Sequence, residues 1–130
     1  MERAIEHIFN MMNWNNPEDV QAEGRKIAAE TGLIEPFLQP LTPRYNKNVW
    51  DNCAAVLAEK SDGELIAYLP QLLEWLQDMN WPGAFCILEL ERLKHYSDKK
   101  ALDEEIAKTK VKAENEKDDV WVSNLNDIFA

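Results

Sequence analysis

Apolar side chains recur every three or four residues along most of the chain, which is the spacing of one face of an α-helix. The first segment shows this pattern plainly, with Ala4, Ile5, Ile8, Phe9 and Met12 on a common face. No stretch of useful length alternates apolar and polar residues with the two-residue period of a half-buried strand. The pattern therefore predicts an all-α fold.

Residues that favour helix ends divide this pattern into segments. Asn16 is suited to cap the second helix and Gly32 to end it, because a short polar side chain accepts amide hydrogens and glycine tolerates a left-handed backbone. Ser61 or Asp62 can cap a later helix, in which Pro70 predicts a kink or a new start. Three prolines between residues 36 and 43 allow only a short, broken helix or a turn-rich connection there.

Tryptophans recur along the chain at intervals of 36, 31 and 40 residues, at Trp14, Trp50, Trp81 and Trp121. Such spacing matches stacked helical hairpins, so we expect one domain over 1–130, a short α-solenoid of HEAT or armadillo type with about three or four helix pairs. The expected pairs are 2–12 with 16–31, 33–41 with 46–60, 62–77 with 81–95, and 99–113 with 118–129. The setting of Trp14 differs from the others, so the first unit is expected to be atypical.

The last third of the chain is more polar. Lysines alternate with acids over 97–119, which predicts one solvated helix with Leu102, Ile106 and Val111 as its apolar line; a partly ordered connection is the alternative. A terminal helix is expected over 120–130. Its large apolar groups, Val120, Trp121, Leu125, Ile128 and Phe129, either cap the stack or make a homo-oligomer through 120–129.

The stretch EWLQDMNWPGA, residues 74–84, places two indoles on either side of a helix break. We expect Trp75 and Trp81 to clamp a hairpin corner, each burying on the order of 200 Å². Asp78 is expected to brace the corner by accepting hydrogen bonds, Asn80 to be a turn or cap residue, and Pro82 to begin the next helix. An aromatic box for a cation or a sugar is the alternative interpretation of the two indoles.

The run LIAYLPQLLEWLQDMNWPGAFCILELERL resembles a family of uncharacterised, mainly bacterial helical domains. That family is marked by a Leu-Leu-Glu-Trp-Leu-Gln-Asp-x-Asn-Trp-Pro signature, here Leu72 to Pro82. The resemblance covers about a quarter of the chain. It implies HEAT-type helical repeats and a place among bacterial toxin-immunity and interaction modules. The family has no established catalytic residues, so the resemblance implies none here.

Composition and charge narrow the possible partners. The net charge of −10 argues against nucleic acid and anionic membrane surfaces, because both demand clustered Lys and Arg. No apolar run reaches the length needed to span a bilayer, and the N-terminus lacks the pattern of a signal peptide. Cys53 and Cys86 lie in apolar helical patterns, so we expect reduced thiols and a cytoplasmic protein; a disulfide between them is the alternative.

Candidate chemistry is sparse. The only histidines, His7 and His95, are far apart in sequence, and no spacing predicts a metal or cofactor site. Glu74 and Asp78 are four residues apart, which suits solvated or turn-bracing carboxylates better than acid–base catalysis. We therefore predict that the chain is not an enzyme. A regulatory subunit that binds a small ligand or a cation is one alternative.

The favoured hypothesis is a non-catalytic protein-binding module of the immunity type, which covers a basic partner such as a toxin that acts on nucleic acid. Stacked hairpins expose a ridge of second helices and a groove beside it. The polar residues expected on this partner surface are Asn48, Asp51, Asn52, Glu89 and Arg92. A homo-oligomeric structural protein is a further alternative.

Overall fold

The computed structural model describes residues 2–39, 47–84, 86–87 and 96–129. Within these ranges every regular element is a helix and there is no strand, so the predicted all-α class is confirmed. The longer helices are α1 (Glu2–Met12), α2 (Glu18–Glu30), α3 (Trp50–Ala58), α5 (Leu69–Glu74), α6 (Lys99–Asn115) and α7 (Asp119–Asn126). The short elements are α4 (Asp62–Leu65) and the 3₁₀ turns η1 (Glu35–Phe37), η2 (Lys47–Val49), η3 (Ile66–Tyr68), η4 (Trp75–Gln77) and η7 (Asp127–Phe129).

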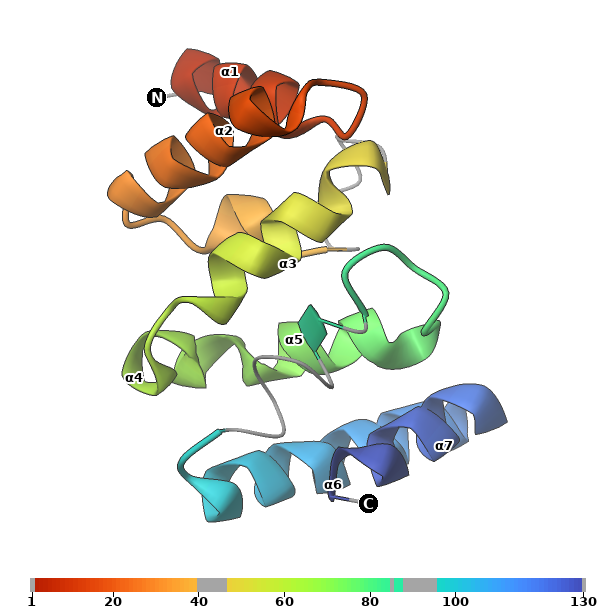
Figure 1. The fold of residues 1–130 in the computed structure, drawn as a ribbon. Helices are drawn as coiled ribbons and strands as arrows, with labels where there is room; N and C mark the ends of the chain where they lie inside the picture. Colours follow the sequence, from red (N-terminus) through yellow and green to blue (C-terminus); the bar gives the residue numbers. More distant parts are fainter. Residues whose placement is uncertain (1, 40–46, 85, 88–95, 130) are drawn as a thin grey trace.

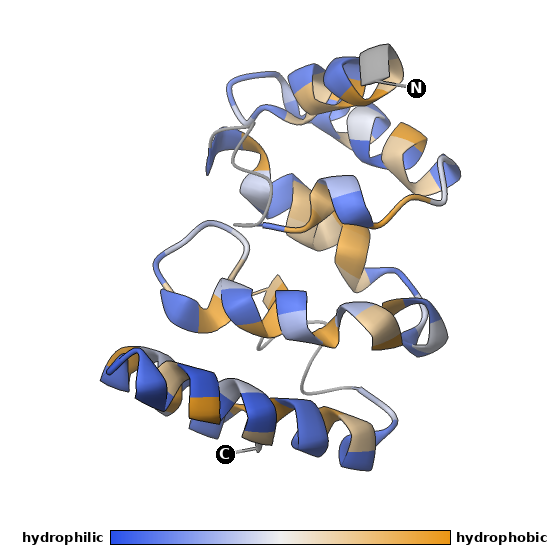
Figure 2. Ribbon diagram, turned by 180° about the vertical axis from the view of Figure 1, so that it is seen from behind, coloured by the Kyte–Doolittle hydropathy of each residue, from blue (hydrophilic) through white to orange (hydrophobic). Residues whose placement is uncertain are grey.

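The helices form successive layers along one direction (Figure 1). The pair α1 and α2 lies at one end, then η1 with α3, then the run from α4 to η4, and finally the pair α6 and α7. The two chain ends lie at opposite ends of the stack. Apolar segments face neighbouring layers, whereas the outer side of the last pair is largely hydrophilic (Figure 2). This arrangement is compatible with the expected short helical solenoid.

The first two helices approach closely because α2 carries a glycine where it crosses α1. A Cβ added to Gly24 would lie 2.9 Å from both Met11 Cβ and Met12 Cγ. Asn16 does not cap α2 as expected, because the N-cap is Pro17, which makes no side-chain hydrogen bond. The Asn16 amide instead donates to the carbonyl oxygens at the end of α1, those of Asn10 at 2.6 Å and Met11 at 3.2 Å.

Other predicted helix ends agree with the structure. Gly32 follows α2 with a φ of +70°, the left-handed conformation that favours glycine. Ser61 caps α4 in a reciprocal capping box with Glu64. Of the two outcomes expected at Pro70, the new helix start is present, because α5 begins at Leu69 and carries the proline in its first turn.

Most of the polar segment 97–119 forms one helix, α6. Its buried face consists of Leu102, Ile106, Thr109 and Ala113. The prediction that Val111 belongs to this face was wrong, since its side chain is 58 % exposed. Residue 111 lies on the opposite side of a helix from a stripe through 102, 106, 109 and 113.

The terminal helix α7 packs against the preceding layer and closes the stack. Trp121, Leu125 and Ile128 are buried, whereas Val120 is 63 % exposed. The Trp121 indole N–H donates to the Leu73 carbonyl oxygen at 3.1 Å, and the Asn124 amide donates to that of Leu76 at 2.7 Å. The Phe129 side chain lies outside the described residues. The buried groups support capping; a homo-oligomer through 120–129 stays a prediction.

Candidate interaction surface

The corner between η4 and residue 84 holds together through local hydrogen bonds. Trp75 is fully buried, and its indole N–H donates to the Pro82 carbonyl oxygen at 2.9 Å. The Asp78 carboxylate accepts the backbone N–H of Asn80 at 2.8 Å, and the Asp78 carbonyl oxygen accepts that of Trp81 at 3.0 Å. Asp78 thus accepts a hydrogen bond within the corner, and Asn80 lies in the turn. Pro82 does not begin a helix as expected, because it still belongs to the turn.

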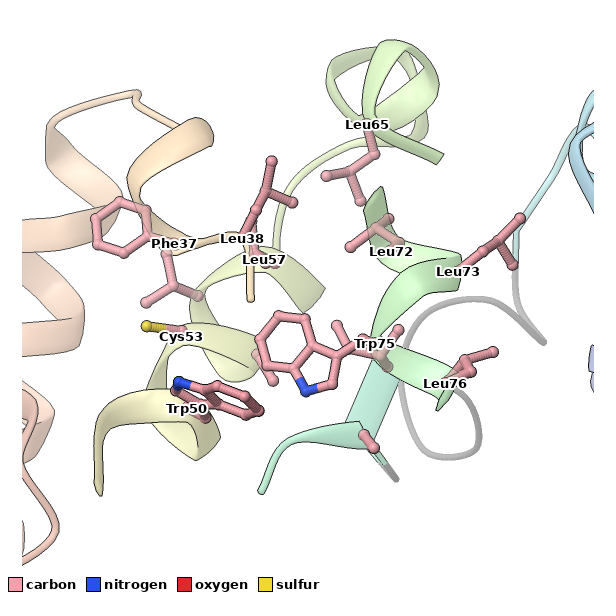
Figure 3. Packing of buried hydrophobic residues seen from close by; sticks show 14 of the residues in the cluster. Phe37, Leu38, Trp50, Cys53, Leu57, Leu65, Leu72, Leu73, Trp75 and Leu76 are labelled. Carbon is pink, nitrogen blue, oxygen red and sulfur yellow. The ribbon is translucent and has the colours of Figure 1, made fainter. Parts of the chain in front are cut away.

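A third indole, that of Trp50 on α3, connects this corner to the preceding layer. The Trp50 and Trp75 rings meet edge to face with centroids 6.2 Å apart (Figure 3). The Trp50 and Trp81 rings are nearly perpendicular, at 87°, with centroids 5.6 Å apart. Trp75 and Trp81 are therefore joined through Trp50, a role that the sequence repeat did not reveal.

Gly83 allows the corner to approach α3. Its φ is +84°, and an added Cβ would lie 2.8 Å from each of Ala54 Cβ, the Trp50 carbonyl oxygen and Trp75 Cζ2. Both the backbone conformation and the lack of space require glycine here.

Lys47, on η2, places its ammonium group in the angle between two of these rings. Its Nζ lies 5.7 Å from the Trp50 ring centroid and 5.8 Å from that of Trp81. Both distances are within the range of cation–π attraction. Next to it, the Asn48 carbonyl oxygen accepts the backbone N–H of Trp14 at 3.1 Å. Corners from three successive layers therefore adjoin one another along one edge of the stack.

The predicted partner surface is only partly exposed. Asp51 is exposed and Asn48 is half-buried, but Asn52 is 6 % exposed and belongs to the core. The expectation that Asn52 faces a partner is therefore corrected. Glu89 and Arg92 lie outside the described residues.

Asn52 joins three helices through its side-chain amide. Its nitrogen donates to the Met12 carbonyl oxygen at 2.6 Å and to the Gln21 side-chain oxygen at 2.9 Å. Its oxygen accepts a hydrogen bond from the Arg25 guanidinium at 2.6 Å, and the same guanidinium pairs with Glu18 at 2.7 Å. A buried amide whose donors and acceptor all have partners specifies how α1, α2 and α3 fit together.

A groove of about 490 Å³ runs between α2 and α3. Three alanines, one valine and four charged residues line it: Ala22, Arg25, Lys26, Ala29, Glu30, Ala55, Val56 and Glu59. Ala22 and Ala29 are exposed, as are Glu30 and Glu59. A groove beside the second helices was expected, but none of its lining residues was predicted. The available signal was the series of alanines on the outer side of α2.

Among the residues that the structure describes, few ionisable side chains lie close together. Glu74 does not pair with Asp78; it forms an ion pair with Lys112 of α6, and this hydrogen bond raises the pKa of Lys112. His7 is exposed, and His95 lies outside the described residues. Among the described residues, no three His, Cys, Asp or Glu side chains are grouped so as to hold a metal ion.

The two cysteines are not joined by a disulfide. Cys53 is fully buried, and burial raises the pKa of its thiol well above the ordinary range. A protonated, buried thiol is a poor nucleophile and packs like a small apolar group. Cys53 therefore contributes to the core of α3.

The described helices, taken one by one, are each too short or too polar to cross a membrane. The fold is that of a small protein built from stacked helix pairs, with an indole corner and a helix–helix groove as its distinctive surfaces. The chain belongs to the family described as domain of unknown function DUF5071, whose model matches residues 46–130. A search of curated proteins and a search of solved structures each found no match.

Proposed function

We propose that this chain is a non-catalytic protein-binding module that holds a segment of a partner protein in the groove between α2 and α3. The groove is the observation that carries the proposal. The small alanine side chains of its lining let a partner side chain approach the two helices closely. The charged side chains of the lining can fix the orientation of that segment. The groove also lies beside the network of Asn52, which joins α3 to Arg25 and Gln21 of α2.

The charges at one end of the groove favour a basic partner. Glu30 is the last residue of α2 and Glu59 is the C-cap of α3, and both line the groove. The two helices run in the same direction, so their C-terminal ends meet at that end (Figure 1). Helix C-termini carry partial negative charge, which adds to the two carboxylates in attracting a Lys or Arg side chain. The net charge of −10 steers such a partner toward the chain.

A toxin-immunity role in a bacterial cytoplasm is the specific form of this proposal. It rests on the Leu72–Pro82 signature, on the HEAT-type repeats that the signature implies, and on the acidic charge. In this role the chain covers a basic toxin and blocks access to the toxin's own substrate.

Affinity purification from cells of the source organism, with wild type and two variants, tests the proposal. Ala29→Trp fills the groove from an exposed position, and Ala107→Trp, exposed on α6, is the matched control. We expect a partner that co-purifies with wild type and A107W but not with A29W. In mixtures of purified proteins, the affinity of A29W for this partner should be at least about tenfold weaker than that of wild type. Equal retention by both variants would exclude the groove.

The immunity role has its own readout. When cells produce the partner as a toxin, co-expression of wild type or A107W is expected to restore growth, and A29W is not. A partner that binds through the groove but does not impair growth would contradict the immunity role and leave protein binding in place.

A further inference from the structure

The indole rings of Trp50, on α3, and Trp81, in the corner, both contact a positive charge that the chain itself supplies. The Trp50 and Trp81 rings meet at 87° with centroids 5.6 Å apart. The Lys47 ammonium lies almost equally far from both centroids, at 5.7 and 5.8 Å. Lys112 makes a comparable contact, 5.8 Å from the Trp121 centroid, but its ammonium group is also paired with the Glu74 carboxylate.

The rings that form this angle are held in place from behind. Trp50 is 6 % exposed and packs edge to face against Trp75, which is fully buried and hydrogen-bonded to Pro82. Trp81 is anchored through its backbone to Asp78. Rings fixed in this way lose little freedom when they bind a cation, which favours binding.

We propose that Trp50 and Trp81 form a site for a quaternary ammonium group, and that Lys47 occupies this site as an internal ligand. The negative faces of two perpendicular indoles attract one cation together, and a methylated ammonium is the class of ligand that such aromatic sites take because its charge is diffuse and weakly hydrated. A primary ammonium such as that of Lys47 is strongly hydrated and is therefore the weaker ligand.

Lys47 can leave the site by a change of side-chain rotamer, because it is exposed. Until it does, it competes with any outside cation at an effective concentration of about millimolar order. Removing it should therefore strengthen binding of an added quaternary ammonium. This inference does not depend on the groove between α2 and α3, so the two can fail separately.

The test is an NMR titration of the indole N–H signals with tetramethylammonium chloride at constant ionic strength. For Lys47→Ala we expect saturable shifts of the Trp50 and Trp81 signals, at least about fivefold tighter than in wild type. The Trp121 signal is the internal reference and should not move. Lys100→Ala, which removes an exposed lysine of α6, should behave like wild type.

Two further measurements separate a cation site from an apolar pocket. Neopentyl alcohol has nearly the same shape as the probe but no charge, and we expect it to cause no saturable shift. Trp81→Leu should abolish binding and Trp81→Phe should weaken it, with an unchanged Trp121 signal showing that each variant is folded. The proposal is overturned if K47A shows no saturable shift, if the neutral alcohol binds equally well, or if folded W81L still binds.

The quaternary ammonium could be presented by a protein, as trimethyllysine, or by a free choline-like molecule. Titration of K47A with a trimethyllysine peptide and with choline distinguishes these sources. Tighter binding of the peptide assigns the ligand to a protein, and tighter binding of choline assigns it to a small molecule. Failure of both to shift the two indole signals contradicts the proposal.

Discussion

The indole N–H of Trp121 donates to the backbone carbonyl oxygen of Leu73 over 3.1 Å, from a side chain with no exposed surface. This bond fastens the last helix pair to the layer before it. Replacing Trp121 with Phe removes the donor and leaves a cavity, so the free energy of unfolding should fall by about 2–4 kcal/mol. Urea denaturation followed by circular dichroism measures the change. Val120→Ala, at an exposed neighbour, should lower it by less than about 0.5 kcal/mol, and similar losses for both variants would contradict the capping role.

Replacement by alanine should change the free energy of unfolding in opposite directions at Gly83 and Gly63. At Gly83 the new Cβ meets three atoms at 2.8 Å on a backbone with positive φ, so we expect a loss of about 2–4 kcal/mol in the free energy of unfolding. At Gly63, inside α4, a Cβ meets nothing within 4 Å, and a gain of about 0.5–1 kcal/mol is expected. Thermal unfolding of the two variants side by side decides the matter; a tolerated Gly83→Ala would show that the corner can relax.

Substitution of Asn52 should lower the free energy of unfolding much more than substitution of its neighbour Asp51. Asn52→Leu leaves the Met12 carbonyl and the Gln21 and Arg25 side chains without their partner, which should cost about 2–3 kcal/mol of stability. Asp51→Asn changes an exposed side chain and should cost less than about 0.5 kcal/mol. Chemical denaturation measures both, and near-neutral behaviour of N52L would show that the three-helix network contributes little.

The ion pair of Lys112 with Glu74 should contribute to stability in a pH-dependent way. The hydrogen bond to Glu74 raises the folded-state pKa of Lys112 above its ordinary value of 10.5. Its contribution is therefore complete below that value and is lost as the pH rises through the folded-state pKa. Lys112→Gln should cost at most about 0.5 kcal/mol near neutral pH, because the lysine side chain is 55 % exposed.

Denaturation of wild type and K112Q at about pH 8 and about pH 12 tests this dependence, and the difference between them should vanish at the higher pH. Lys100→Gln corrects for the general loss of lysine charge. A difference that stays constant with pH would show that Lys112 acts through packing of its aliphatic chain.

Lys117 offers a stabilising substitution. It has a φ of +56° at the end of α6, where its N–H donates to the Glu114 carbonyl and that of Asp118 donates to the Ala113 carbonyl. These bonds form a Schellman motif, in which glycine is preferred at the left-handed position. Lys117→Gly should raise the free energy of unfolding by about 1 kcal/mol, whereas Lys108→Gly within the helix should lower it by about 1 kcal/mol. If thermal unfolding shows the same loss of stability for both glycine variants, the Schellman motif at Lys117 is refuted.

The helices and the indole corner could be predicted because local chemistry determines them. Ser61 with Glu64, and Gly32 after α2, are signals within a few residues of the feature they produce. The turn of Asp78 to Trp81 is equally local. Such features can be predicted from a stretch of only a few consecutive residues.

Asn52, Val111 and the groove could not be predicted in the same way. The middle helix α3 lies between layers, so most of its circumference is buried and a polar residue there can face a neighbour instead of solvent. Val111 is the reverse case, an apolar residue on the solvated side of α6. The groove depends on the distance between α2 and α3, which is set by contacts between residues 27 and 31 positions apart in sequence.

The close approach of the Trp50, Trp75 and Trp81 rings also has an optical consequence. Transitions of aromatic chromophores at such separations couple, so excitation is shared among them and the intact corner should add an exciton signal to the far-ultraviolet spectrum. The apparent helix content of this chain measured by circular dichroism will therefore be distorted in the native state. The same signal offers a label-free reporter of when the corner opens.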